Sequence, residues 1–106
     1  MIVSTSETIA LHRILRTLGL VRGNTIRARH VGTDITAAFR NIVGGEIGEY
    51  TKLLGEAREQ ALDRMVAEAE ELGANGVVMV RFSTSMVMSG AAELLAYGTA
   101  VVIEPE

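Results

Sequence analysis

Apolar and small residues between Tyr50 and Leu72 recur at the intervals of three and four that place them along one face of an α-helix. They are Tyr50, Leu53, Leu54, Ala57, Ala61, Met65, Ala69 and Leu72. The opposite face is charged, and Gly73 offers the left-handed conformation in which helices commonly end. The pattern predicts one long helix over about residues 47–73.

Apolar and alternating stretches on both sides of this helix predict strands. Residues 13–22 and 25–31 predict a hairpin whose turn is Arg22-Gly23-Asn24, because glycine and asparagine favour the positive φ of such turns. From Gly76 onward a strand is predicted with one face formed by Val78, Val80, Phe82, Met86 and Met88. The last predicted strand, Leu94–Ile103, is apolar on both faces.

Thr33 or Asp34 can cap a short helix over about residues 34–43, which Gly44-Gly45 ends. The order of elements predicts an α+β fold in which both helices pack on a mainly antiparallel sheet of about four to five strands. A chain of 106 residues suits one domain, 1–106.

The predicted sheet has two apolar faces, and the long helix can cover one of them. A large exposed apolar face promotes association, so we expect a closed homo-oligomer. The charges favour the same outcome. Residues 1–45 carry six arginines and two acids, whereas residues 46–73 carry eight acids and three bases, so neighbouring copies have complementary potentials.

Composition narrows the possible partners and locations. The chain has no cysteine, which excludes a disulfide and a thiolate metal site. No apolar stretch reaches the roughly 18 uninterrupted residues of a membrane span, so we expect a cytoplasmic protein without a membrane partner. Arg22, Arg27 and Arg29 are candidates for a nucleic-acid surface, but a net charge of -3 and 4% aromatic residues argue against one.

Four segments together resemble the YbjQ-type family of small bacterial and archaeal proteins: RNIVGGEIGEY (40–50), EAREQA (56–61), ELGANGVV (71–78) and YGTAVVIE (97–104). The resemblance covers nearly the whole chain. It implies a subunit of dodecin-like architecture, a ring-shaped homopentamer and the heavy-metal-binding label that such families carry. Its most distinctive motif makes five residues the first ligand-binding candidates: Arg40, Gly44, Gly45, Gly48 and Tyr50.

Histidine is the main metal-ligand candidate in a chain without cysteine, since imidazole suits zinc, copper and nickel. Neither His12 nor His30 has a second histidine at helical spacing. His30, with Asp34 close in sequence, is the predicted metal site, to which each copy in a ring contributes one ligand; a structural or exposed histidine is the alternative. Met86 and Met88 are either Cu(I) ligands or core residues.

The glycine-rich segment 44–48 is either a hinge or part of a ligand pocket. It lacks the lysine of a phosphate loop, and Glu46 and Glu49 repel phosphate. No nucleophile motif or acid–base pair indicates an enzyme. The resulting hypothesis is a non-enzymatic oligomer that binds a heavy-metal ion or small ligand between subunits. The alternative is a structural or partner-binding oligomer without a small ligand.

Overall fold

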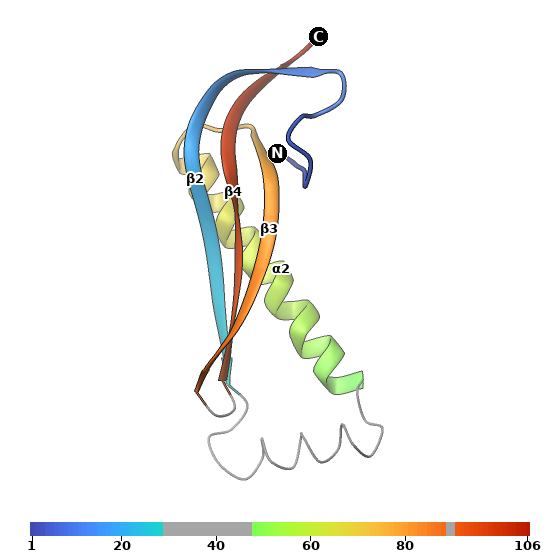
Figure 1. Cartoon of the computed structure of the whole chain (residues 1–106), viewed down its shortest axis with the longest axis vertical. Coiled ribbons are helices and arrows are strands. Elements are labelled where there is room, and N and C mark those ends of the chain that lie inside the picture. The colour runs from blue at the N-terminus through green and yellow to red at the C-terminus, as the bar shows by residue number, and fades with distance from the viewer. Residues whose placement is uncertain (29–47, 89–90) are drawn as a thin grey trace.

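The computed structural model describes residues 1–28, 48–88 and 91–106, which form a sheet with a long helix against one face (Figure 1). The elements are β1 (Ile2–Val3), β2 (His12–Ala28), α2 (Gly48–Glu71), β3 (Gly76–Met88) and β4 (Ala91–Pro105). The strand order is β1-β3-β4-β2. β4 pairs antiparallel with both β2 and β3, whereas β1 pairs parallel with β3.

The predicted α+β class is therefore confirmed, with one correction to the sheet. It has four strands and is mixed, because the first residues of the chain align parallel to the start of β3, with Ile2 opposite Gly76. The short helix predicted for residues 34–43 lies outside the described residues. No helix among the described residues is long and apolar enough to cross a membrane.

Helix α2 follows its predicted pattern from Ala57 to Ala69, but Leu54 and Leu72, predicted on the same face, are 40% and 49% exposed. Its buried face is formed by Ala57, Ala61, Met65 and Ala69. After Glu71 the chain turns at Gly73, whose φ is 86°, and the N–H groups of Gly73 and Ala74 donate to the carbonyls of Glu70 and Ala69 at 3.0 Å each. These two bonds form the Schellman ending expected for a C-terminal glycine.

The predicted hairpin of residues 13–22 with 25–31 is wrong. β2 is one strand of 17 residues that pairs along its length with β4, and Gly23 lies within it opposite Ala96. Gly23 serves packing instead of a turn, since a Cβ built on it would lie 2.2 Å from the carbonyl oxygen of Ala61. The missing side chain lets β2 approach the backbone of α2 directly.

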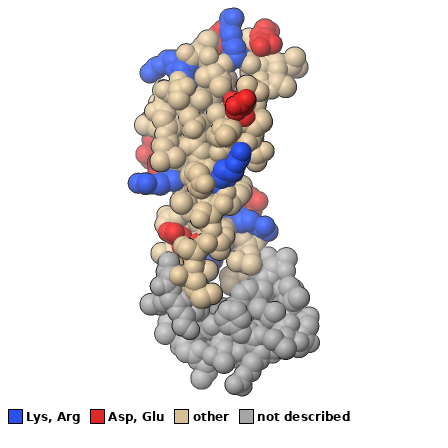
Figure 2. Space-filling view, in the orientation of Figure 1, with Lys and Arg blue, Asp and Glu red and all other residues tan. Residues whose placement is uncertain are grey.

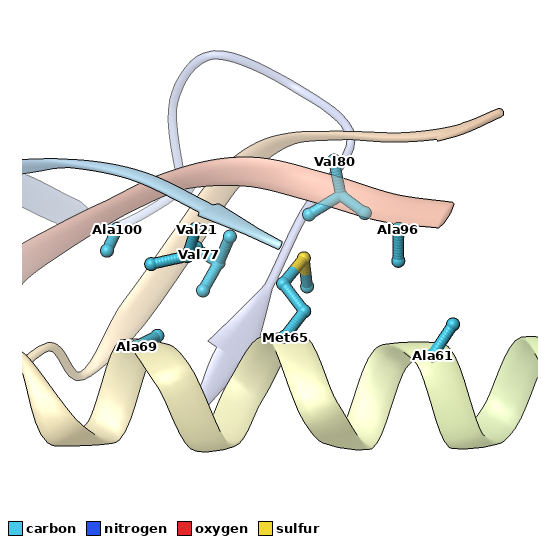
Figure 3. Close-up of a cluster of buried hydrophobic side chains, with 8 residues drawn as sticks. All are labelled: Val21, Ala61, Met65, Ala69, Val77, Val80, Ala96 and Ala100. Atoms are coloured by element: carbon cyan, nitrogen blue, oxygen red, sulfur yellow. The ribbon is translucent and has the colours of Figure 1, made fainter. Parts of the chain in front are cut away.

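Small side chains fill the layer between α2 and the sheet (Figure 3). Alanines line both sides, and Met65 is the largest fully buried side chain among the described residues. The cluster consists of Val21, Ala61, Met65, Ala69, Val77, Val80, Ala96 and Ala100. Beside it, the hydroxyl of buried Thr25 donates to the carbonyl of Ala57 at 3.2 Å, so the polar group in this layer is satisfied.

A bulge in β3 changes which residues face the helix. Met79 has a φ of 57°, and the register with β4 shifts between Val78 and Arg81. Val80 therefore joins the core under α2, while Val78 lies in a second cluster with Val101 and Ile103. The predicted common face for Val78 and Val80 is wrong, because an extra residue reverses the alternation.

The core assignment of Met86 is also wrong. Its side chain is 69% exposed. Met86 pairs with Ala92 on β4, on the same face of the sheet as the core, but α2 lies chiefly over β2 and β4 and contacts β3 little. The helix therefore leaves this part of β3 uncovered.

The second cluster is covered by the chain's own N-terminal segment. Ile9 packs against it from outside the sheet. The backbone holds this segment in place, because Ser4 N–H donates to Val77 O at 2.9 Å and Met79 N–H donates to Ser6 O at 3.0 Å. The face away from α2 is thus partly covered within the subunit, which the sequence pattern did not predict.

Replacing Gly23 with alanine tests the close approach of β2 to α2. Gly23→Ala should lower the free energy of unfolding by about 3 kcal/mol or more, because the new methyl group overlaps helix backbone that cannot rotate away. Urea denaturation at one fixed protein concentration measures the change.

Gly55→Ala is the matched control. A Cβ at Gly55 would have only Arg58 Nη2 nearby, at 3.9 Å, so alanine should stabilise α2 by up to about 1 kcal/mol. Similar small effects of the two substitutions would contradict the packing role of Gly23.

Candidate functional site

The residues predicted as ligand and metal sites lie mostly outside the described part of the chain. This applies to Arg40, Gly44, Gly45, His30 and Asp34. Gly48 and Tyr50 lie in the first turn of α2. The ligand site and the His30 metal site therefore stay predictions.

A cavity of about 320 Å³ lies at the opposite end of α2. Segments far apart in sequence meet there: the start of β2, the last turn of α2, the turn before β3 and the end of β4. Its polar lining includes His12, Glu70 and Asn75, and its apolar lining includes Ile103 and Pro105. The fold thus places one imidazole and one carboxylate in the wall of a common cavity.

The ring of His12 is held by the turn that precedes β2. Nδ1 lies 2.8 Å from the carbonyl oxygen of Ala10, and the backbone N–H of His12 donates to Ile9 O at 3.1 Å. A carbonyl oxygen only accepts, so Nδ1 carries the proton in this hydrogen bond. In the neutral ring, Nε2 is then the nitrogen with a free lone pair.

Asn75 closes the cavity by bridging two elements. Its Nδ2 donates to Ile103 O at 2.8 Å, and its Oδ1 accepts from Ile103 N–H at 2.7 Å. Both ends of the amide are therefore used in bonds to the β4 backbone. Asn75 positions the wall of the cavity, and its amide is not free to bind a ligand.

The charges around the cavity are negative at the helix end. α2 has no basic residue in its last turn, where Glu70 and Glu71 lie next to the negative end of the helix dipole. The nearby Arg13 forms an ion pair with Glu104. Met1, which bears the N-terminal ammonium, also lines the cavity, so the negative charge is local to the helix end.

A closed metal site needs about four protein ligands. Within residues 1–28, 48–88 and 91–106, no group of three or more His, Asp or Glu side chains could hold a metal ion. One subunit therefore offers, in its described part, an open site at most, in which water or another molecule fills the remaining positions.

A second hollow, of about 380 Å³, lies beside β2. It is lined by Arg22, Asn24, Glu68, Glu93 and Leu95. Asn24 Nδ2 donates to Glu93 Oε2 at 3.2 Å across it. The lining combines one arginine with two carboxylates, so it indicates a polar contact surface more than a binding site for one charged ligand.

The arginines of β2 do not form one basic face. Arg27 lies on the side of α2, where its Nη2 donates to Gln60 Oε1 at 2.9 Å, whereas Arg22 lies opposite Tyr97 on the other face of the sheet. Arg29 is outside the described residues. The structure thus gives no support to a nucleic-acid surface on this strand.

Sequence reasoning did not assign the cavity. His12 and Glu70 are 58 positions apart, and no local spacing connects them. They line one cavity because β2 is a single long strand whose first residue, His12, lies at the end of α2. The predicted hairpin divided this strand in two, so the sequence pattern did not place His12 near the end of α2.

The described residues define a class: a small α+β subunit with a mixed sheet, a long helix on one face and an open cavity at the helix end. The chain belongs to the YbjQ-type family, whose model matches residues 1–104 and is described as "Putative heavy-metal-binding". The resemblance noted from the sequence motifs is therefore confirmed.

Relatives from bacteria and archaea match over almost the whole chain. UPF0145 proteins from Dehalococcoides mccartyi and Methanosarcina acetivorans are each 60% identical, over 104 and 103 residues, which is 98% and 97% of this chain. The matches cover 100% and 97% of those relatives. These names record a family without an assigned activity.

One solved structure confirms the fold. A crystal structure of a DUF74-family protein of unknown function from Pediococcus pentosaceus superposes with a TM-score of 0.69 and covers 98% of each chain. Its sequence identity is 16%, so the likeness shows the shared architecture alone.

Asn75→Ala tests the bridge that closes the cavity. The variant should lose about 1–3 kcal/mol of stability, because both hydrogen bonds to Ile103 are removed and the Ile103 backbone loses its partner. Thermal or urea unfolding measures the change. Asn24→Ala, which removes one exposed bond to Glu93, should change stability by less than about 0.5 kcal/mol. Equal losses of stability in the two variants would contradict the bridging role of Asn75.

Proposed function

We propose that this protein is a non-enzymatic, cytoplasmic homo-oligomer, a ring of five copies, that binds a heavy-metal ion or small ligand. The single observation that supports it best is the sheet, which within residues 1–28, 48–88 and 91–106 has two different unpaired edges and an incompletely covered face. The metal in this proposal comes from the description of the family, and the number of copies comes from the family resemblance.

β2 is an edge strand of 17 residues whose partner is β4 on one side. On the other edge of the sheet, β1 pairs with β3 at Gly76 and Val77 only. Among the described residues, the outer side of β3 from Arg81 to Met88 has no strand beside it. Long free edges are templates for pairing with another chain.

Two different edges favour a ring. If β2 of one copy pairs with β3 of the next, the contact is head to tail, and such contacts close into a ring when the rotation permits. A β2–β2 contact would instead form a dimer and leave the edge of β3 free. A ring uses both edges.

The face of the sheet away from α2 is apolar enough to serve as an interface. Leu20 and Ile26 are 63% and 60% exposed there, beside the half-buried side chains of Leu95 and Tyr97. Figure 2, which views the molecule from this side, shows a largely uncharged surface with separate charged side chains. Such a surface is stabilised when another copy covers it.

The dimensions of the subunit agree with association. Its accessible surface is 6865 Å², whereas a compact chain of this mass exposes roughly 5,700 Å². Its radius of gyration is 17.1 Å, against about 13 Å for a compact domain of this length. A flat, elongated subunit buries little of its surface when alone, and it buries more when it packs against other copies.

Leu20→Lys tests the assembly. Leu20 is exposed in the single subunit, so lysine should leave the subunit folded, but a charge on the interface should shift the ring to smaller species. Native mass spectrometry of the wild type should give one oligomer, and that of the variant a lower mass.

Leu72→Lys, at the end of α2, introduces the same charge at a residue that is 49% exposed and away from the sheet, and it should leave the ring intact. A monomeric wild type would overturn the assembly proposal, and so would an unchanged ring in Leu20→Lys.

Metal addition tests the ligand. A metal present at a hundred times its dissociation constant should stabilise the folded protein by about 2.7 kcal/mol, and a chelator should reverse the effect. Differential scanning fluorimetry with Zn²⁺, Ni²⁺, Cu²⁺ and Mg²⁺ separates a transition-metal site from general ionic effects. The absence of any shift with the three transition metals would contradict metal binding.

A further inference from the structure

The cavity at the end of α2 combines three features of a metal site that arise independently of one another. They are a histidine with one nitrogen held by the backbone, a carboxylate in the same cavity wall, and a helix end without a basic residue. We propose that this cavity binds a divalent transition-metal ion, with His12 Nε2 and the Glu70 carboxylate as its protein ligands. The proposal rests on the metal-binding function proposed above and names its site.

The hydrogen bond of His12 prepares the ring for a metal. Histidine ligands almost always donate their second ring N–H to a carbonyl or carboxylate, which fixes both the tautomer and the orientation of the ring. The bond from Nδ1 to Ala10 O, at 2.8 Å, has this form. It belongs to the turn that starts β2, where the His12 N–H also donates to Ile9 O, so the ring is held by a structured segment.

The end of α2 that lies against the cavity favours a cation. The C-terminal end of a helix carries a partial negative charge, and basic side chains usually lie there. α2 instead has Glu70 and Glu71 in its last turn and no basic residue. The neighbouring Arg13 is paired with Glu104. A bound divalent ion would offset the repulsion between Glu70 and the helix end.

The donor atoms select the kind of metal. One imidazole and one carboxylate suit Zn²⁺, Ni²⁺ or Cu²⁺, while soft ions prefer the thiolates that this chain lacks. A volume of about 320 Å³ holds an ion with several waters, each of which occupies about 30 Å³. With two protein ligands, the site is open and exchangeable, in contrast to a closed structural zinc site.

Isothermal titration of the intact oligomer with zinc chloride tests the site. Because changing even an indirect partner of a metal ligand costs 10–100-fold in affinity, His12→Ala should weaken zinc binding by more than about tenfold, and Glu70→Gln should also weaken it. Glu71→Gln is the matched control. It removes the same charge one residue further along the same helix turn, outside the cavity, and should weaken zinc binding much less than Glu70→Gln does.

The histidine nitrogens give a second readout that a purely structural role would not produce. In a ¹H–¹⁵N spectrum of the imidazole groups, His12 should keep its proton on Nδ1, and zinc should shift the Nε2 resonance. His30→Ala should leave both the affinity and this shift unchanged. If His12→Ala fails to fold, the zinc affinity of Glu70→Gln and the imidazole spectrum of the wild type still test whether the cavity is the metal site.

The outcomes separate the two proposals. If the wild type binds none of Zn²⁺, Ni²⁺ and Cu²⁺, metal binding fails and the site fails with it. If the wild type binds zinc, but Glu70→Gln and His12→Ala bind it equally well, or the Nε2 resonance does not move, the cavity is not the site. The metal-binding function then stands, and loss of binding in His30→Ala would place the ion at the site predicted from the sequence.

Discussion

The close contact between β2 and α2 is the constraint on which the rest of the fold depends. Because Gly23 has no side chain, the strand meets the helix backbone near Ala61, and the layer around this contact holds mostly alanines and valines beside Met65. A helix held this close to β2 and β4 cannot also cover β3. The exposed side chain of Met86 follows from that single approach.

Features determined by neighbouring residues were predictable from the sequence. The spacing of Ala57, Ala61, Met65 and Ala69 places them on one face of any helix, and Gly73 ends that helix through bonds to carbonyls within one turn. The α+β class follows from the order of such elements. Each of these inferences needs only the periodicity and the backbone preferences of short segments.

Features determined by distant contacts were not predictable. The same glycine and asparagine chemistry that suits a turn at residues 22–24 is compatible with a strand pressed against a helix, and only the position of Ala61 decides between them. The reversal at Met79 depends on the bonds from β3 to the N-terminal segment. The shared cavity of His12 and Glu70 arises in the same way, because only the folded chain places both residues in its wall.

The central position of β4 has a consequence for how the chain folds. β4 is the last element in sequence, yet it lies between β3 and β2, and it pairs with β2 across separations as large as the 93 residues from His12 to Pro105. The β3–β4 hairpin can form from local contacts, but β2 has no strand to join until β4 has been synthesised. During translation β2 therefore remains unpaired until β4 is available. Because a long loop must close, the pairing of β2 with β4 is a slow step in folding.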